Sequence, residues 1–282
     1  MTDKPISYMP TPGLSYDPED PKYWDEASLQ QEVTRVFEVC HGCRMCFKYC
    51  DSFPRLFDYI DKSCSGDVAL LTSEHKDAVV DDCFQCKLCE VQCPYTPRDG
   101  HEYQLDFPKL VHRYQAIRHR KQGSSLRDRL LGDPDGAGRA ARMSFGLANV
   151  MNRVGVHRWF MEKVLGIHRN KLLPDFAMTT FGRWAEAMGL TKKPPSSEAT
   201  LFPTCFVENN EPQIGRDTVD VLTRNGVSVA CPKGLQCCGM PAWEHGDLET
   251  LRKHAEHNRD LQAQDSEATC AHRLEKSVAH AV

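Results

Sequence analysis

The sequence has 282 residues, of which 40% are hydrophobic and 26% charged, a composition typical of a soluble globular chain with room for two domains. Its net charge of −4 and pI of about 6.3 argue against a nucleic-acid-binding protein and against a polybasic membrane anchor. The N-terminus lacks a basic stretch followed by an apolar one, and no segment approaches the roughly 18 apolar residues of a membrane span. We therefore expect a cytoplasmic protein.

The N-terminal part is predicted to be an arm followed by a helical domain. Residues 1–25 carry five prolines and little apolar content, so we expect an extended arm that wraps a partner or a neighbouring domain. Apolar residues at helical spacing predict a helix over 26–39, ending at Cys40-His41-Gly42, and another over 53–61. This first predicted domain covers residues 26–102.

The rest of the chain is predicted to divide into a helical connector and a domain in which strands and helices alternate. Residues 103–195 hold no cysteine and repeat apolar side chains every three or four positions, which predicts a helical connector. A polar, proline-rich break then leads into residues 196–282, where strand, helix, strand and helix are predicted in turn. Their ranges are 199–203, 211–225, 226–230 and 246–264. The predicted fold class is mainly α, with a small α/β C-terminal part.

The cysteines carry the strongest signal in the sequence. Fourteen cysteines in a reducing compartment indicate metal ligands or redox groups rather than disulfides. Eight of them form two runs with the spacing C-x2-C-x2-C-x3-C, and Pro94 follows the second run. The first run is Cys40, Cys43, Cys46 and Cys50, and the second is Cys83, Cys86, Cys89 and Cys93.

This spacing is typical of proteins with two [4Fe–4S] clusters. One loop presents three thiolates to three corners of a cubane, and the fourth cysteine of the run ligates the other cluster. The predicted ligands are Cys40, Cys43, Cys46 and Cys93 for cluster 1, and Cys83, Cys86, Cys89 and Cys50 for cluster 2. Zinc is the alternative metal, although zinc ribbons use separated C-x2-C pairs. Clusters that only hold the fold together are the other alternative.

Four further cysteines form a second constellation near the C-terminus, namely Cys205, Cys237, Cys238 and Cys270. Thirty-one residues separate Cys205 from the adjacent pair, and thirty-one more separate the pair from Cys270. Gly234 and Gly239 flank the pair and would let the backbone approach a bulky inorganic group. Buried thiols in an α/β core and a redox-active thiol pair are the alternatives. The two remaining cysteines, Cys64 and Cys231, are interpreted as structural.

With both cysteine runs, Phe202-Pro203-Thr204-Cys205 and Gln236-Cys237-Cys238-Gly239, the chain resembles a known family. It is similar to the iron–sulfur subunits related to heterodisulfide reductase and anaerobic glycerol-3-phosphate dehydrogenase. The resemblance implies an α-helical two-cluster ferredoxin followed by a cysteine-rich CCG domain. It also implies a third, non-cubane [4Fe–4S] cluster at the four C-terminal cysteines. The family's closing cysteine is replaced here by Arg273, and the chain carries a single CCG repeat.

A local excess of positive charge is hidden by the net charge. Residues 111–173 contain thirteen Lys or Arg against four Asp or Glu. A solvated helical face is the default interpretation. The alternative is a docking surface for a partner subunit or for the anionic inner face of a membrane, which would make the protein peripheral there. No aromatic-interleaved basic motif accompanies the charge, so we expect no nucleic acid partner.

These features predict an iron–sulfur electron-transfer protein that relays single electrons through two [4Fe–4S] clusters within an oxidoreductase complex. Other oxidoreductase subunits would be the electron donor and acceptor. No G-x-G-x-x-G or G-x4-G-K-[ST] motif is present, and no catalytic residue is assigned. One rival hypothesis is a catalytic subunit that reduces a disulfide at a third cluster. Another is a regulatory iron–sulfur protein that senses oxygen or iron.

Overall fold

The structure is a computed structural model that describes residues 7–191 and 198–264. The described residues form two compact units. Unit 1 comprises residues 7–123 together with 243–247, and unit 2 comprises the described parts of 124–242 and 248–264.

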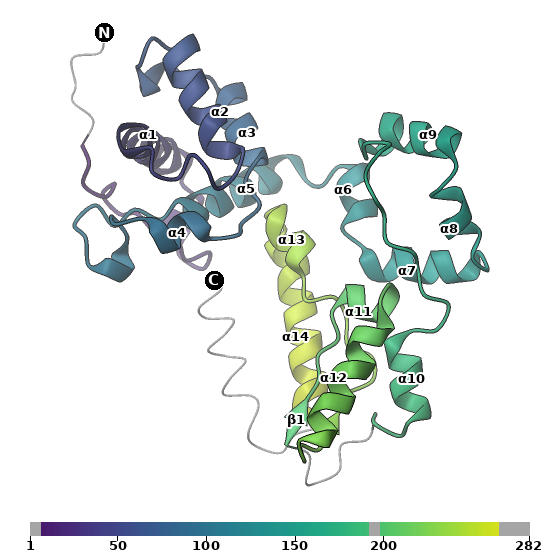
Figure 1. Cartoon of the computed structure of the whole chain (residues 1–282). Coiled ribbons are helices and arrows are strands. Elements are labelled where there is room, and N and C mark those ends of the chain that lie inside the picture. Colours follow the sequence, from purple (N-terminus) through teal and green to yellow (C-terminus); the bar gives the residue numbers. More distant parts are fainter. Residues whose placement is uncertain (1–6, 192–197, 265–282) are drawn as a thin grey trace. The chain divides into compact units, whose positions relative to one another are not determined.

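Unit 1 is helical throughout, as Figure 1 shows. Its α-helices are α1 (Glu26–Cys43), α2 (Ser52–Asp58), α3 (Ser73–Asp81), α4 (Leu88–Gln92) and α5 (Phe107–Gln122). Shorter turns of other helix types are η1 (Pro21–Trp24), η2 (Tyr59–Ser63), η3 (Val68–Leu70) and η4 (Pro97–Asp99). The long helices begin at aspartate caps: the Asp25 carboxylate accepts the N–H of Ser28 at 2.6 Å, and that of Asp106 accepts the N–H of Lys109 at 3.0 Å.

One apolar core joins α1, α2, α3 and α5. The ring centroids of Phe53 in α2 and Phe107 in α5 lie 4.7 Å apart, and Phe37 of α1 packs on the same ring of Phe107. Burying each such side chain contributes about 1.5–3 kcal/mol. Cysteines of both runs pack against the edge of this core, so its helices fix where the two runs lie.

The described part of the N-terminal arm is bound to its own unit. The buried Thr11 donates from Oγ1 to Glu32 of α1 at 2.8 Å, and Arg35 of α1 donates to the carbonyl of Tyr8 at 2.7 Å. Arg113 of α5 is fully buried and donates to the carbonyls of Lys22, Tyr23 and Asp25. These arginines supply hydrogen-bond donors to carbonyl groups of the arm, which in an isolated arm would be hydrogen-bonded to water.

The first predicted helix ends later than the sequence suggested. We expected it to stop at Cys40-His41-Gly42, yet α1 continues through Gly42 to Cys43. Arg44 then adopts a left-handed conformation with φ of 56° and donates its N–H to the carbonyl of Cys40 at 2.8 Å. A left-handed residue after the last turn is a common helix ending. The last turn of α1 therefore carries both Cys40 and Cys43.

Unit 2 combines short helices with one two-stranded parallel sheet, so the predicted class, mainly α with a small α/β part, is confirmed. Its helices are α6 (Leu126–Leu131), α7 (Pro134–Met143), α8 (Leu147–Met151), α9 (Gly155–Leu165), α10 (Phe181–Ala187), α11 (Cys205–Asn209), α12 (Pro212–Arg224) and α14 (Leu248–Gln264). A further helix, α13 (Met240–Glu244), leads out of this unit into unit 1.

The two strands are shorter than predicted. Strand β1 (Ala199–Thr200) pairs with β2 (Val229–Ala230), with Ala199 opposite Val229. β1 cannot extend through Pro203, because proline has no N–H to give to the ladder. A small core of Phe181, Ala185, Val219, Val229 and Cys231 lies around this sheet. The sheet therefore supports the segments that follow each strand, which carry Cys205 and Cys237.

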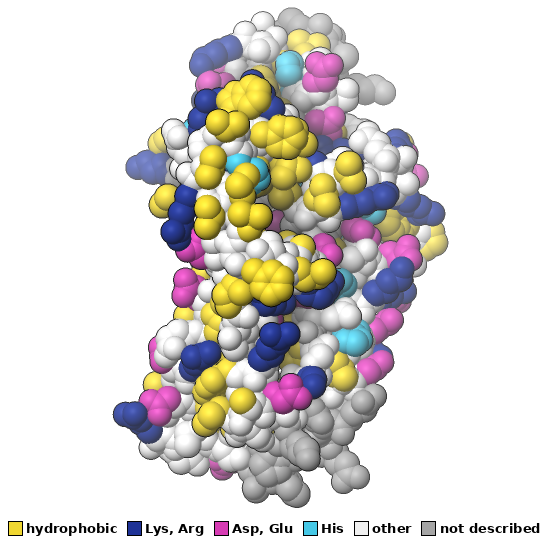
Figure 2. Space-filling model, turned by 90° about the vertical axis from the view of Figure 1, so that its right-hand side faces the viewer, with side chains coloured by type: hydrophobic (Ala, Val, Ile, Leu, Met, Phe, Trp, Pro, Cys, Tyr) yellow, Lys and Arg dark blue, Asp and Glu magenta, His cyan; other side chains and the backbone are white. Residues whose placement is uncertain are grey.

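The helices α6–α9 contribute little to that core. All residues from 124 to 180 are described, and Ala141 is the one buried apolar side chain among them. Phe145 and Leu172 expose 89% and 91% of their surface. On the face where α7, α8 and α9 lie, Figure 2 shows hydrophobic side chains gathered in patches, with Lys and Arg side chains beside them. This segment therefore presents an unusually apolar surface.

Candidate iron–sulfur sites

The first cysteine run is wrapped around the C-terminal end of α1. Cys40 and Cys43 are three residues apart in the last helical turn and so lie on one face. Arg44 follows with a left-handed φ of 56°, and Cys46 lies near both of them. Cys50 follows just before α2, and the backbone N–H groups of Ser52 and Phe53 donate to its sulfur.

The second run contains two residues with a left-handed backbone conformation. Gln85 and Lys87 both have left-handed φ values, 53° and 60°, which are uncommon for residues other than glycine. The N–H of Gln85 donates to the sulfur of Cys83. Cys89 then lies on α4, and Cys93 ends that helix with its N–H on the carbonyl of Cys89. The loop therefore brings Cys83, Cys86 and Cys89 to a common side.

The eight cysteines of the runs line two hollows in unit 1. The first is lined by Cys40, Cys43, Cys46 and Cys93, and the second by Cys50, Cys83, Cys86 and Cys89. In each hollow the fourth cysteine comes from the other run. The structure thus brings together the two sets that the sequence grouped as ligands, while their binding of clusters stays a prediction.

The two runs face each other through equivalent positions. When the two runs are aligned by their cysteines, Cys46 corresponds to Cys89 and Tyr49 corresponds to Gln92. The sulfur of Cys46 lies 4.0 Å from the carbonyl oxygen of Cys89, and the Tyr49 hydroxyl donates to Gln92 Oε1 at 3.2 Å. Equivalent positions of the two runs therefore lie close to each other.

Electrostatics in these hollows favours a bound cationic group. Burial, and then the neighbouring thiols, raise the pKa of Cys46 to about 11, and burial raises the pKa of Cys83 to about 11. Cys40 and Cys89 have pKa values raised further by the same causes. Four clustered thiolates without a counter-charge would repel one another, whereas iron binds them in the deprotonated form. The donor set therefore fits an iron–sulfur cluster.

No group of three or more His, Cys, Asp or Glu side chains converges on a single metal ion within the described residues. A lone zinc ion holds its thiolates about 2.3 Å from one centre, whereas a cubane spreads its ligands over four iron corners.

In the C-terminal constellation, the structure brings Cys205, Cys237 and Cys238 together in unit 2. Cys205 is the first residue of α11, and the Thr204 side chain caps that helix by accepting the N–H of Val207 at 3.3 Å. The thiols of Cys205 and Cys237 are hydrogen-bonded, which lowers the pKa of Cys205 to about 7 and raises that of Cys237. Hydrogen bonding to Cys237 also raises the pKa of Cys238. Cys270 and Arg273 lie outside the described residues.

The loop that carries the cysteine pair is held from two sides. Asp135 of α7 accepts the N–H of Cys237 at 2.8 Å, and Asn258 of α14 accepts the N–H of Gln236 at the same distance. Gly239 has φ of 88°, and a Cβ there would lie 2.7 Å from Leu251 Cδ1. The left-handed conformation therefore favours glycine at this position, and a larger residue would also displace the end of the Leu251 side chain.

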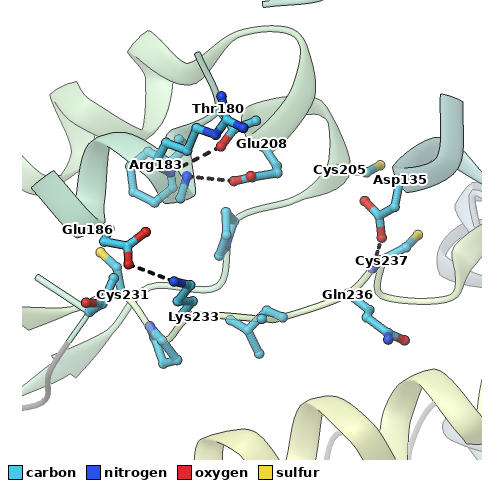
Figure 3. A pocket seen from close by; sticks show the side chains of 17 residues that line it. Asp135, Thr180, Arg183, Glu186, Cys205, Glu208, Cys231, Lys233, Gln236 and Cys237 are labelled. Carbon is cyan, nitrogen blue, oxygen red and sulfur yellow. Dashed lines mark hydrogen bonds and ion pairs between the residues drawn. The ribbon is translucent and has the colours of Figure 1, made fainter. Parts of the chain in front are cut away.

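A cavity of about 240 Å³ lies beside these thiols. Figure 3 shows Cys205, Cys237 and Asp135 on one side of it and Cys231 with Lys233 on the other. Lys233 is paired with Glu186 at 2.7 Å. The cavity leaves room for a group larger than a water molecule next to Cys205 and Cys237.

Three polar residues near the cysteines were not found by sequence reasoning. Asp135 precedes Cys237 by 102 positions, so no local pattern connects them. Tyr95, whose side chain is hydrogen-bonded to Cys43, follows the second run by two residues. Gln85 lies inside the second run, where comparison of the two runs would have singled it out.

The comparison with protein families identifies two cysteine-rich domains in this chain. A 4Fe-4S dicluster domain matches residues 39–96, and a cysteine-rich domain matches residues 199–272. The predicted resemblance is thereby confirmed: the chain carries an iron–sulfur dicluster domain and a CCG domain. No solved structure matches the chain.

Among curated proteins, the chain is similar to a subunit of anaerobic glycerol-3-phosphate dehydrogenase and to lactate utilization protein A. It is 28% identical to a subunit of anaerobic glycerol-3-phosphate dehydrogenase from Escherichia coli (strain K12) over 131 residues, 46% of this chain and 33% of that protein. It is 43% identical to lactate utilization protein A of Shouchella clausii over 58 residues, 21% of this chain and 24% of that protein. The matches thus span about a third of the first relative's length and about a quarter of the second's.

Proposed function

We propose that this protein relays single electrons through two [4Fe–4S] clusters within an oxidoreductase complex. The observation that carries the proposal is the pair of four-cysteine hollows in which the fourth cysteine comes from the other run. Cys46 and Cys50 line different hollows yet lie four residues apart, so the chain limits their separation to about 14 Å. Two redox centres this close together suit sequential transfer of electrons, whereas holding a fold together requires no such proximity.

The relatives suggest the partners. One is named as a subunit of a dehydrogenase, so we propose that other oxidoreductase subunits act as electron donor and acceptor here. Substrate oxidation would then belong to another subunit. The third centre that the resemblance implies would be held by Cys205, Cys237, Cys238 and Cys270, and the cavity of unit 2 lies beside Cys205 and Cys237.

The test begins with anaerobic purification and measurement of iron, acid-labile sulfide and zinc per chain. About eight irons with matching sulfide support two cubanes, and about twelve support a third cluster and the rival catalytic role. Zinc with little sulfide would refute the proposal. The reduced protein should then pass one electron at a time to an acceptor at catalytic rates, and failure to do so would favour a regulatory iron–sulfur protein.

We further propose that residues 124–173 of the basic segment, which carry α6–α9, rest on the anionic inner face of a membrane, and that the protein is otherwise cytoplasmic. The helices α6–α9 combine exposed apolar side chains with the excess of Lys and Arg. That combination is typical of helices that lie in the plane of the interface. Within the described residues, none of the helices has both the length and the apolar character that crossing a bilayer requires.

Vesicle binding tests this surface. We expect the protein to sediment with vesicles that contain anionic lipid and not with neutral ones. Replacing Phe145 and Leu172 together by glutamate should weaken binding at least about tenfold, because each buried apolar side chain contributes about 1.5–3 kcal/mol. The matched control is Val221→Glu, since Val221 is exposed on α12 outside the segment. Equal binding by all three proteins would rule out the membrane contact.

A further inference from the structure

Gln85 has a buried carboxamide with no partner in the described structure. The residue exposes 6% of its surface, and neither its Nε2 nor its Oε1 has a hydrogen-bond partner among the described residues. An unsatisfied buried polar group of this kind costs about 1–3 kcal/mol. Native proteins rarely carry that cost without a ligand, ion or water to offset it.

The place of this side chain points to the missing partner. Gln85 lines the hollow formed by Cys50, Cys83, Cys86 and Cys89, and its left-handed backbone already directs its N–H to the sulfur of Cys83. Thiolate and inorganic sulfide are hydrogen-bond acceptors only, so the Nε2 end of the carboxamide is the end that can face them.

The carboxamide belongs to one hollow and not to the other. Aligning the two runs places Gly42 at the position of Gln85. Gly42 has no side chain, and nothing lies within 4 Å of where its Cβ would be. The first hollow instead has the side chain of Tyr95 hydrogen-bonded to Cys43. Each hollow therefore has its own side-chain donor, which lets the two sites be adjusted separately.

We infer that the Gln85 carboxamide donates an N–H···S hydrogen bond to the [4Fe–4S] cluster of the second hollow and thereby raises the reduction potential of that cluster. The inference rests on the proposed two-cluster function. When one electron enters a cluster, negative charge on its sulfurs increases. A fixed N–H dipole therefore stabilises the reduced state more than the oxidised one, and hydrogen bonds to the sulfurs are a recognised determinant of cluster potential.

The experiment is a redox titration of the full-length, cluster-loaded protein, followed by electron paramagnetic resonance. Gln85→Leu removes the donor, and we expect the midpoint potential of one cluster to become more negative while that of the other is unchanged. Tyr95→Phe should lower the potential of the other cluster alone. The matched control is Gln104→Leu, because Gln104 is an exposed glutamine of the same unit that also has a left-handed φ, 42°. The control should move neither potential.

Iron content separates the two claims. If the wild-type protein holds two clusters and Gln85→Leu titrates like Gln104→Leu, the inference about Gln85 is overturned while the relay function stands. If the wild-type protein holds no iron–sulfur cluster, the proposed function fails first. Gln85→Met provides a second apolar side chain of similar length. Loss of cluster iron in both variants would mean that the carboxamide holds the site together, which also overturns a tuning role.

Discussion

The Cys50→Ala variant is expected to lose the same cluster as the Cys89→Ala variant, although Cys50 belongs to the first run. Both residues line the second hollow. Each variant should retain about four of about eight irons per chain, and the two should leave identical electron paramagnetic resonance spectra. Cys93→Ala and Cys46→Ala should form the complementary pair, since both residues line the first hollow.

The control for this comparison is Cys64→Ala. Cys64 is 2% exposed and packs in the core of unit 1, but it lines neither hollow. Its replacement should leave about eight irons in place at a small cost in stability. If the ligands were not exchanged, Cys50→Ala would instead match Cys46→Ala, and the grouping proposed here would be wrong.

The grouping of the cysteines could be predicted from the sequence, because cluster chemistry imposes a short and fixed spacing on the ligands of one run. A cubane needs several thiolates from one loop, so the runs ending at Cys50 and Cys93 are recognisable without a structure. Helix ends were harder to predict. Gly42 indicated a stop, but the end of α1 is set two residues later by Arg44, whose side chain is hydrogen-bonded to Asp61 at 2.8 Å. Tertiary contacts of that kind leave no periodic pattern.

The C-terminal constellation was predictable only in part. The adjacent cysteines and Gly239 form a local motif, and the strands that precede them have a local pattern. Asp135 is different, because it reaches Cys237 from α7 across 102 positions of sequence. Its role depends on how α7 packs beside the loop, and packing is decided by many weak contacts that no single spacing records.

The Glu32→Gln variant should destabilise unit 1 by about 3–5 kcal/mol. Glu32 and Arg35 of α1 form a buried ion pair, with Arg35 Nε donating to Glu32 Oε2 at 2.8 Å and both residues almost completely buried. Neutralising one partner leaves the other charge buried without compensation, which is the costly case for such pairs. The pair also holds the arm, because Thr11 donates to Glu32 and Tyr8 accepts from Arg35.

Urea unfolding under anaerobic conditions, followed by helical circular dichroism, measures this loss. Limited proteolysis should in addition cut the arm between residues 7 and 25 faster in Glu32→Gln than in the wild type. Glu26→Gln is the matched control on the same helix, since Glu26 pairs with Lys121 at the exposed surface. That exposed pair contributes at most about 1 kcal/mol. Equal stability of the two variants would show that the buried pair does not anchor the arm to the helix that carries Cys40 and Cys43.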